Sequence, residues 1–154
     1  MKKFVSLLIF LLIPLGVGGL SALLTSNSAE VYQNLTLPPL APPSSVFPVV
    51  WTVLFILMGI SSFLVYNCQI AERQTALKTY GLQLAVNFFW PLIFFKLQMF
   101  LAAFIWLLIL WLLIIKMIKQ FWQIRPVAGI LQIPYFLWVT FAAYLNLSIY
   151  LLNG

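Results

Sequence analysis

The sequence contains no histidine, one cysteine and only two acidic residues among its 154 positions. Without histidine, the chain lacks the commonest metal ligand and the usual acid–base group at neutral pH. The single cysteine, Cys68, cannot form an intrachain disulfide. Neither Glu30 nor Glu72 lies inside an apolar stretch, so ion-coupled transport has no intramembrane carboxylate to use. These absences argue against acid–base catalysis, and we expect no metal site and no required cofactor.

Charged residues of both signs are scarce. They make up 6% of the chain, whereas 64% of the residues are hydrophobic. Soluble domains use roughly 25% charged and 45–50% apolar residues. The few charged residues of this chain could therefore not cover the surface of a soluble fold. The composition therefore predicts an all-α, multi-pass membrane protein. The net charge of +6 then reports orientation in the membrane, and no nucleic-acid partner is expected.

Long apolar runs with charges at their ends predict five transmembrane helices in one domain, residues 1–154. The first run, residues 4–24, has 21 positions without a charge and would be roughly 31 Å long as a helix. That length matches the hydrocarbon core of a bilayer. Lys2 and Lys3 also permit a cleaved signal peptide, but the run exceeds the roughly 7–15 residues of a signal-peptide core. The other spans are predicted at residues 46–70, 76–95, 99–118 and 127–152.

The basic residues predict the orientation of these spans. Only Lys96 falls on the side opposite the N-terminus. Because basic residues concentrate on the cytoplasmic side, we expect the N-terminus in the cytoplasm and the C-terminus outside. The basic residues on the N-terminal side are Lys2, Lys3, Arg73, Lys78, Lys116, Lys119 and Arg125.

The connection between the first two spans, residues 25–45, is long and rich in proline. Five of the nine prolines of the chain lie between Pro38 and Pro48. Proline fixes φ and pushes the preceding residue toward extended conformations, so Leu37 to Pro43 should be stiff and non-helical. We expect a structured lid over a pocket on the outer face. The alternative is a stiff connector without a ligand beneath it.

Amide and aromatic side chains recur on single faces of two predicted spans. A polar side chain in lipid needs a partner, so these faces should point into the bundle. For Gln83 and Asn146, hydrogen bonding between helices is the favoured role; for Asn87 with Trp90 and Trp138, a ligand site is favoured. The two faces comprise Tyr80, Gln83, Asn87 and Trp90 in the third span, and Pro134, Trp138, Ala142, Asn146 and Tyr150 in the fifth.

Helix rise places the key tryptophans at one depth. Trp51 would lie about 9 Å below Ser45, and Trp90 about 9 Å inside Lys96. These residues should converge beneath the proline-rich connection and form an aromatic cavity with a few amides. Such a cavity suits a planar apolar ligand. Without histidine as an axial ligand, a metal-free macrocycle or a lipid is favoured over a redox haem.

Three motifs give the chain a specific resemblance to a known family. They are Y-x-x-L-x-x-P-x-x-x-P-P-x-x-x-F-x-x-V-W-T-x-L from Tyr32 to Leu54, Q-L-x-x-N-x-x-W-P from Gln83 to Pro91, and P-Y-x-x-W-x-x-F-A-x-x-L-N from Pro134 to Asn146. From Tyr32 to its C-terminus the chain resembles the TspO/MBR family, the tryptophan-rich sensory proteins related to the mitochondrial translocator protein. Leu40, Leu37 and Ile105 stand where that family usually has Trp, Lys and Asp.

The resemblance implies a five-helix bundle, often dimeric, that binds porphyrins and, in animal members, cholesterol. By this resemblance, ligand contacts fall on Tyr32, Trp51, Asn87, Trp90, Trp138 and Ala142. The predicted ligand-binding set also includes Pro42, Pro43, Phe47 and Asn146.

We therefore expect a porphyrin-binding receptor of a bacterial plasma membrane, with protoporphyrin IX or a related tetrapyrrole as ligand. Its role would be stress-linked sensing, sequestration or transport. A homodimer is expected, with lipid or sterol as further ligands. A first alternative is light- and oxygen-dependent degradation of the porphyrin, in which Trp51 and Trp138 would be the redox-active, catalytic residues. A second alternative is a structural membrane protein whose aromatic faces only pack.

Overall fold

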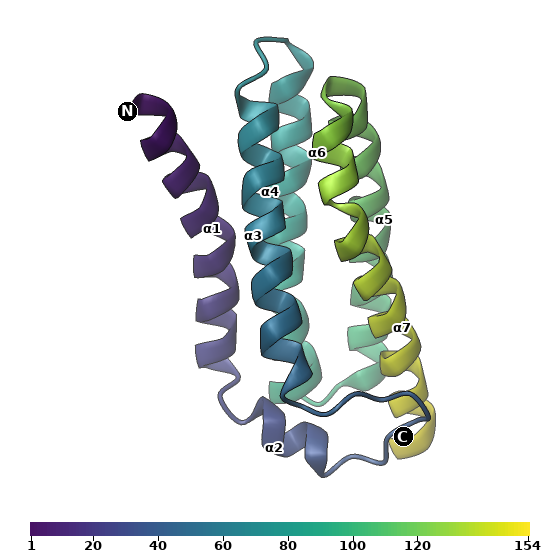
Figure 1. The fold of residues 1–154 in the computed structure, drawn as a ribbon. Coiled ribbons are helices and arrows are strands. Elements are labelled where there is room, and N and C mark those ends of the chain that lie inside the picture. Colours follow the sequence, from purple (N-terminus) through teal and green to yellow (C-terminus); the bar gives the residue numbers. More distant parts are fainter.

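The computed structural model describes all residues 1–154 and contains helices and no strands (Figure 1). The chain runs back and forth along a bundle, and its two termini lie at opposite ends. The long helices are α1 (Lys2–Leu24), α3 (Val46–Tyr66), α4 (Glu72–Pro91), α5 (Phe100–Ile124) and α7 (Ile133–Asn153). The short elements are α2 (Ser28–Gln33), the π-helical turn η1 (Leu92–Lys96) and α6 (Pro126–Leu131).

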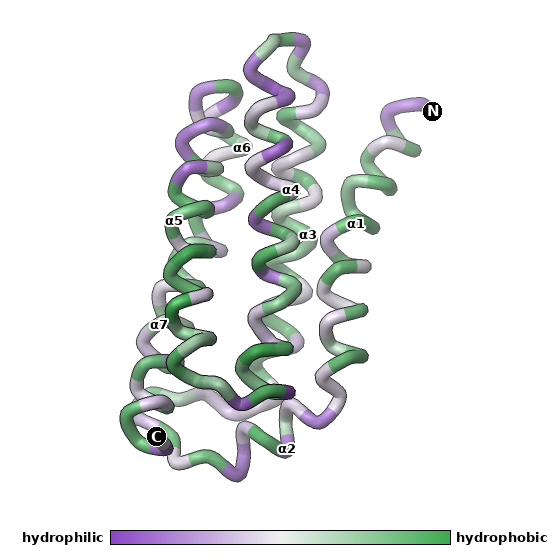
Figure 2. The backbone as a smooth tube through the Cα atoms, turned by 180° about the vertical axis from the view of Figure 1, so that it is seen from behind, coloured by the Kyte–Doolittle hydropathy of each residue, from purple (hydrophilic) through white to green (hydrophobic).

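The long helices confirm an all-α membrane protein. Four helical segments are long and apolar enough to cross a bilayer: Lys2–Leu24, Val46–Tyr66, Phe100–Ile124 and Pro126–Asn153. Figure 2 shows apolar residues along the helices and polar residues gathered where the chain turns. The remaining long helix, α4, has 20 residues and carries three charges in its first two turns, which lower its mean hydropathy.

The helix bounds differ from the predicted spans. α3 ends four residues early, at Tyr66, where the Arg73 guanidinium donates a 2.7 Å hydrogen bond to the Tyr66 carbonyl. α4 starts at Glu72 and passes after Pro91 into η1. α5 continues to Ile124, where the extended backbone of Arg125 ends it. The predicted fifth span is divided into α6 and α7 by a turn at Gln132.

The helices pack unevenly. α5 contacts α4, α6 and α7, and its buried face contributes Leu107, Leu110 and Ile114 to the main core. α1 packs mainly against α3, and the two backbones approach closely at Gly59. Toward the N-terminus, α1 diverges from the other helices (Figure 1).

The chain between α1 and α3 crosses one end of the bundle (Figure 1). It contains α2, a helix that the sequence analysis did not predict, followed by the non-helical proline segment (Leu35–Ser45). The prediction that Leu37 to Pro43 is non-helical is confirmed. We call this end of the bundle the proline end, and the opposite end, where Arg73, Lys119 and Arg125 lie, the basic end.

Two tyrosine hydroxyls hold the proline segment against the helices. The Tyr32 hydroxyl of α2 donates to the Pro42 carbonyl at 2.6 Å, and the Tyr144 hydroxyl of α7 donates to the Pro39 carbonyl at 2.7 Å. The segment therefore does not hang free of the bundle.

Candidate ligand-binding site

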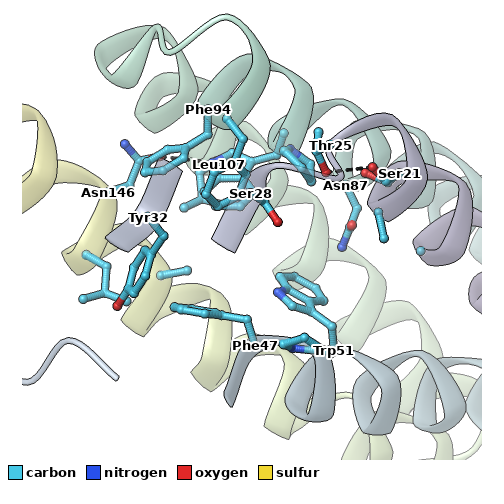
Figure 3. A pocket seen from close by; sticks show the side chains of 18 of the residues that line it. Ser21, Thr25, Ser28, Tyr32, Phe47, Trp51, Asn87, Phe94, Leu107 and Asn146 are labelled. Atoms are coloured by element: carbon cyan, nitrogen blue, oxygen red, sulfur yellow. Dashed lines mark hydrogen bonds between the residues drawn. The ribbon is translucent and has the colours of Figure 1, made fainter. Parts of the chain in front are cut away.

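A cavity of about 230 Å³ lies inside the bundle next to the proline end. Its walls come from α1, α3, α4, η1, α5 and α7, and α2 closes it at the proline end. Figure 3 shows Tyr32, Phe47 and Trp51 on one side of this space, opposite Phe94 and Asn87. Fifteen of its 24 lining residues are hydrophobic, a pattern typical of small-molecule sites.

The structure brings together eight of the ten predicted ligand-binding residues. They line the cavity from four separate helices: Tyr32, Phe47, Trp51, Asn87, Trp90, Trp138, Ala142 and Asn146. Pro42 and Pro43 do not line it. Instead, the Pro42 carbonyl accepts the Tyr32 hydroxyl, so this proline acts on the cavity only through the position of Tyr32.

The aromatic walls are in mutual contact. The Phe47 ring meets Tyr32 and Trp138 edge to face, with centroids 5.0 and 5.8 Å apart. Farther inside, Trp51 stacks on Phe55 at 5.6 Å. Each contact lies in the range of favourable aromatic pairs. The α3 wall is therefore a continuous aromatic surface that extends onto α2 and α7.

Asn146 connects helices through both of its polar atoms. Its Oδ1 accepts the Trp90 indole N–H at 3.0 Å, and its Nδ2 donates to the Phe100 carbonyl at 2.8 Å. The bridging role expected from the sequence is thus satisfied. The Trp90 indole N–H is also committed, so Trp90 offers the cavity its ring surface.

Asn87 belongs to a second buried network. Its Nδ2 donates to the Tyr135 hydroxyl at 2.8 Å, and that hydroxyl donates to Gln83 Oε1 at 2.6 Å. Gln83 is fully buried and ties α4 to α7, as expected. Asn87 lines the cavity, and its Oδ1 makes no hydrogen bond to the protein, so it is free to accept one from a ligand.

Two further groups define the polarity of the cavity. The Trp138 indole N–H is buried and has no hydrogen-bond partner. Burial raises the pKa of the Tyr32 hydroxyl above its usual value of 10.0, so this group stays neutral over the physiological range. No lining residue carries a charge. The site therefore offers aromatic surface with a few neutral donors and acceptors.

α1 and η1 also line the cavity, although neither was predicted from the sequence to do so. Gly18, Ser21 and Ala22 of α1 line the cavity, as do Thr25, which follows this helix, and Phe94 of η1. The α1 residues are small and recur three or four apart, so they share one face of the helix. The same stripe leaves the space that forms one wall.

Comparison with known proteins agrees with these features: residues 10–152 match the TspO/MBR family. The chain belongs to the TspO/MBR family. It is 33% identical over 155 residues to the tryptophan-rich protein TspO of Chlorobaculum tepidum, covering 99% of this chain and 98% of that protein. It is 36% identical over 124 residues to the protein CrtK of Rhodobacter capsulatus (79% and 78% covered). The translocator protein of Ovis aries is 33% identical over 118 residues (75% and 70% covered).

Proposed function

We propose that this chain is a receptor that binds porphyrin or a related tetrapyrrole in the aromatic cavity, for sensing, sequestration or transport. The proposal includes five spans, with α4 as the one that composition alone does not single out. All three charges of α4 lie in its first two turns, and the rest of the helix is uncharged. With the basic end cytoplasmic, the cavity lies in the outer half of a bacterial plasma membrane.

The observation that carries the proposal is the convergence of aromatic rings around an uncharged space. A planar macrocycle would gain about 0.5–1.5 kcal/mol from each aromatic pair, beyond the burial of its surface. The free Asn87 Oδ1 and the unpartnered Trp138 N–H supply the few polar contacts that fix orientation in such sites.

Size and charge indicate how a porphyrin would enter. The cavity of about 230 Å³ is smaller than the roughly 300–1,000 Å³ of most small-molecule sites. A macrocycle would therefore displace α2 and the proline segment or protrude at the proline end. Its carboxylates would then face water and Lys96, the single basic residue near that end.

Titration of protoporphyrin IX into the purified protein, followed by the shift of the porphyrin absorbance, tests the proposal. Replacing Trp51 and Trp138 together by Ala should weaken binding by about tenfold or more, because two ring contacts are lost. A matched variant, Trp111→Ala with Trp122→Ala, removes two indoles that do not line the cavity and should bind like the wild type. Equal affinity of all three proteins would contradict the site.

A second candidate function is light- and oxygen-dependent degradation of the bound porphyrin. It is favoured by the presence of two indoles, Trp51 and Trp138, in the lining of one cavity. Illumination in air should then bleach the porphyrin faster in the presence of the protein than in its absence. Trp51→Phe should abolish this acceleration of bleaching while the variant still binds the porphyrin. Equal bleaching without protein would end this candidate.

The remaining alternative, a structural protein, would leave no cavity between the aromatic faces, so the observed cavity makes it the weakest of the three. A lipid or sterol as a further ligand and a homodimeric assembly belong to the proposal. Competition of a lipid or sterol with the porphyrin for the cavity would test the further ligand. The mass of the protein, measured without the contribution of bound detergent, would test the homodimer.

A further inference from the structure

Three side chains in the half of the bundle toward the basic end have buried polar atoms without a hydrogen-bond partner in the protein: Tyr80, Gln132 and, near the C-terminal end of α5, Gln120. Both amide atoms of Gln132 are unpartnered, and the side chain is 0% exposed. The hydroxyl of Tyr80 is also unpartnered, with the residue 5% exposed. Buried polar groups almost always have a partner, either protein or ordered water. The unpartnered atoms of Gln132 and Tyr80 therefore point to a bound group in this part of the interior.

Helix geometry brings the two side chains to one level. α4 and α7 run in the same direction along the bundle (Figure 1), and Gln83 of α4 bonds the Tyr135 hydroxyl of α7. Tyr80 precedes Gln83 by three residues, and Gln132 precedes Tyr135 by three. Residues three apart share a helix face, so both lie about 4.5 Å farther toward the basic end. They face the same layer of the interior.

Further polar groups face this layer. Ser62 of α3 lies beside the Tyr80 phenol and is 0% exposed. The Gln83 amide nitrogen has one acceptor, the Met58 sulfur at 3.9 Å, which is a weak partner. The surrounding core side chains, including Met58, Val65 and Phe121, are fully buried, so bulk solvent does not reach the layer.

Gln132 also occupies a break in the helical chain. It stands between α6 and α7, and Pro134 follows two residues later. A proline removes one backbone donor from the first turn of α7. Burying a polar side chain at such a break costs free energy unless its amide is hydrogen-bonded.

We propose that this layer is a binding site for internal water, held by Gln132 and Tyr80 and supported by Ser62. A water molecule both donates and accepts, so it can satisfy the Gln132 amide and the Tyr80 hydroxyl at once, within the two to four partners that buried water needs. The site extends the Asn87–Tyr135–Gln83 network by one turn. Polar contacts then run from the ligand cavity to the α6–α7 break. This inference does not depend on which ligand the cavity binds.

Nuclear magnetic resonance on ¹⁵N-labelled protein in bicelles tests the site through magnetisation transfer from water to side-chain amides. The Gln132 amide, assigned by its loss in Gln132→Leu or Gln132→Asn, should show a water cross-peak. Asn146 is an internal control, because it is 1% exposed and its amide nitrogen donates to a protein carbonyl. It should show no cross-peak, whereas exposed Gln98 should show one.

Tyr80→Phe, and Ser62→Ala as a second variant, should reduce the Gln132 cross-peak at least about twofold, because each removes a partner of the bound water. The distant Tyr150→Phe should leave it unchanged. A wild-type Gln132 amide without a water cross-peak, in a spectrum where Gln98 shows one, would overturn the proposal. A cross-peak that is equal in wild type, Tyr80→Phe and Ser62→Ala would overturn it as well.

Discussion

Asn153, in the last turn of α7, hydrogen-bonds both backbone groups of Thr36, which lies 117 residues earlier in the chain. Its Oδ1 accepts the Thr36 N–H at 3.0 Å, and its Nδ2 donates to the Thr36 carbonyl at 2.9 Å. Nδ2 also donates to the Ile149 carbonyl, which anchors the amide to its own helix. The C-terminal turn thereby holds the proline segment over the end of the cavity.

Asn153→Ala should loosen this attachment. The two lost bonds are solvent-exposed and worth about 0.5–1.5 kcal/mol each, so the Thr36 amide should exchange with solvent about tenfold faster. Hydrogen–deuterium exchange followed by mass spectrometry measures this rate. Asn34→Ala is a matched control, because Asn34 is exposed in the same connection and its side chain makes no hydrogen bond. Equal exchange in both variants would contradict the attachment.

Leu40 is in a strained backbone conformation at the tip of the proline segment. Its φ is 72°, in a turn closed by the Ala41 N–H donating to the Pro38 carbonyl at 3.3 Å, and its side chain is 82% exposed. A positive φ costs an L-residue roughly 1–2 kcal/mol.

Leu40→Asn should therefore raise the free energy of unfolding by about 0.5–1 kcal/mol, since Asn tolerates this conformation. Leu40→Val should lower it by a similar amount, because a β-branched side chain fits worse at positive φ. Thermal unfolding in detergent ranks the three proteins. A higher unfolding temperature for Leu40→Val than for Leu40→Asn would show that the turn does not impose this conformation.

Gly59 permits the close packing of α1 on α3. A Cβ atom at this position would lie 2.7 Å from the Phe10 carbonyl oxygen and 2.9 Å from Leu11 Cα, both backbone atoms that cannot move alone. Gly59→Ala should lower the free energy of unfolding by about 1–3 kcal/mol. Gly16→Ala in α1 meets open space and should be neutral or stabilising, because Ala favours the helix. Denaturation midpoints measure the stability of both variants. Equal midpoints for Gly59→Ala and Gly16→Ala would refute this packing.

The Tyr135 hydroxyl joins two buried amides at once. It accepts from Asn87 and donates to Gln83, and the residue is 1% exposed. Tyr135→Phe leaves both amides short of a partner, so the free energy of unfolding should fall by about 2–4 kcal/mol. Tyr150→Phe, at a tyrosine whose hydroxyl makes no hydrogen bond to the protein, should change it by less than about 0.5 kcal/mol. Comparable losses would mean that the network adds nothing to stability.

Much of the architecture follows from local sequence. Apolar runs of about 20 residues leave no soluble alternative, and the prolines keep Leu37 to Pro43 out of a helix. The helix-face spacing of Trp138, Ala142 and Asn146 also placed these residues on the inner face of one helix. The extent of each helix was harder to predict: α3 stops at Tyr66, whose carbonyl accepts a hydrogen bond from a side chain of the next helix.

The sequence by itself determined the membrane class, the long helices in outline and the inward faces of α4 and α7, because apolar length and helical period are local properties. Only the tertiary structure decided which inward amides remain free. Asn146 is committed to Trp90 and Phe100, whereas Asn87 keeps its oxygen for the cavity. It also decided that Asn153 holds Thr36. Each of these partners comes from a distant segment, and a hydrogen bond between them forms only when packing brings the two atoms together.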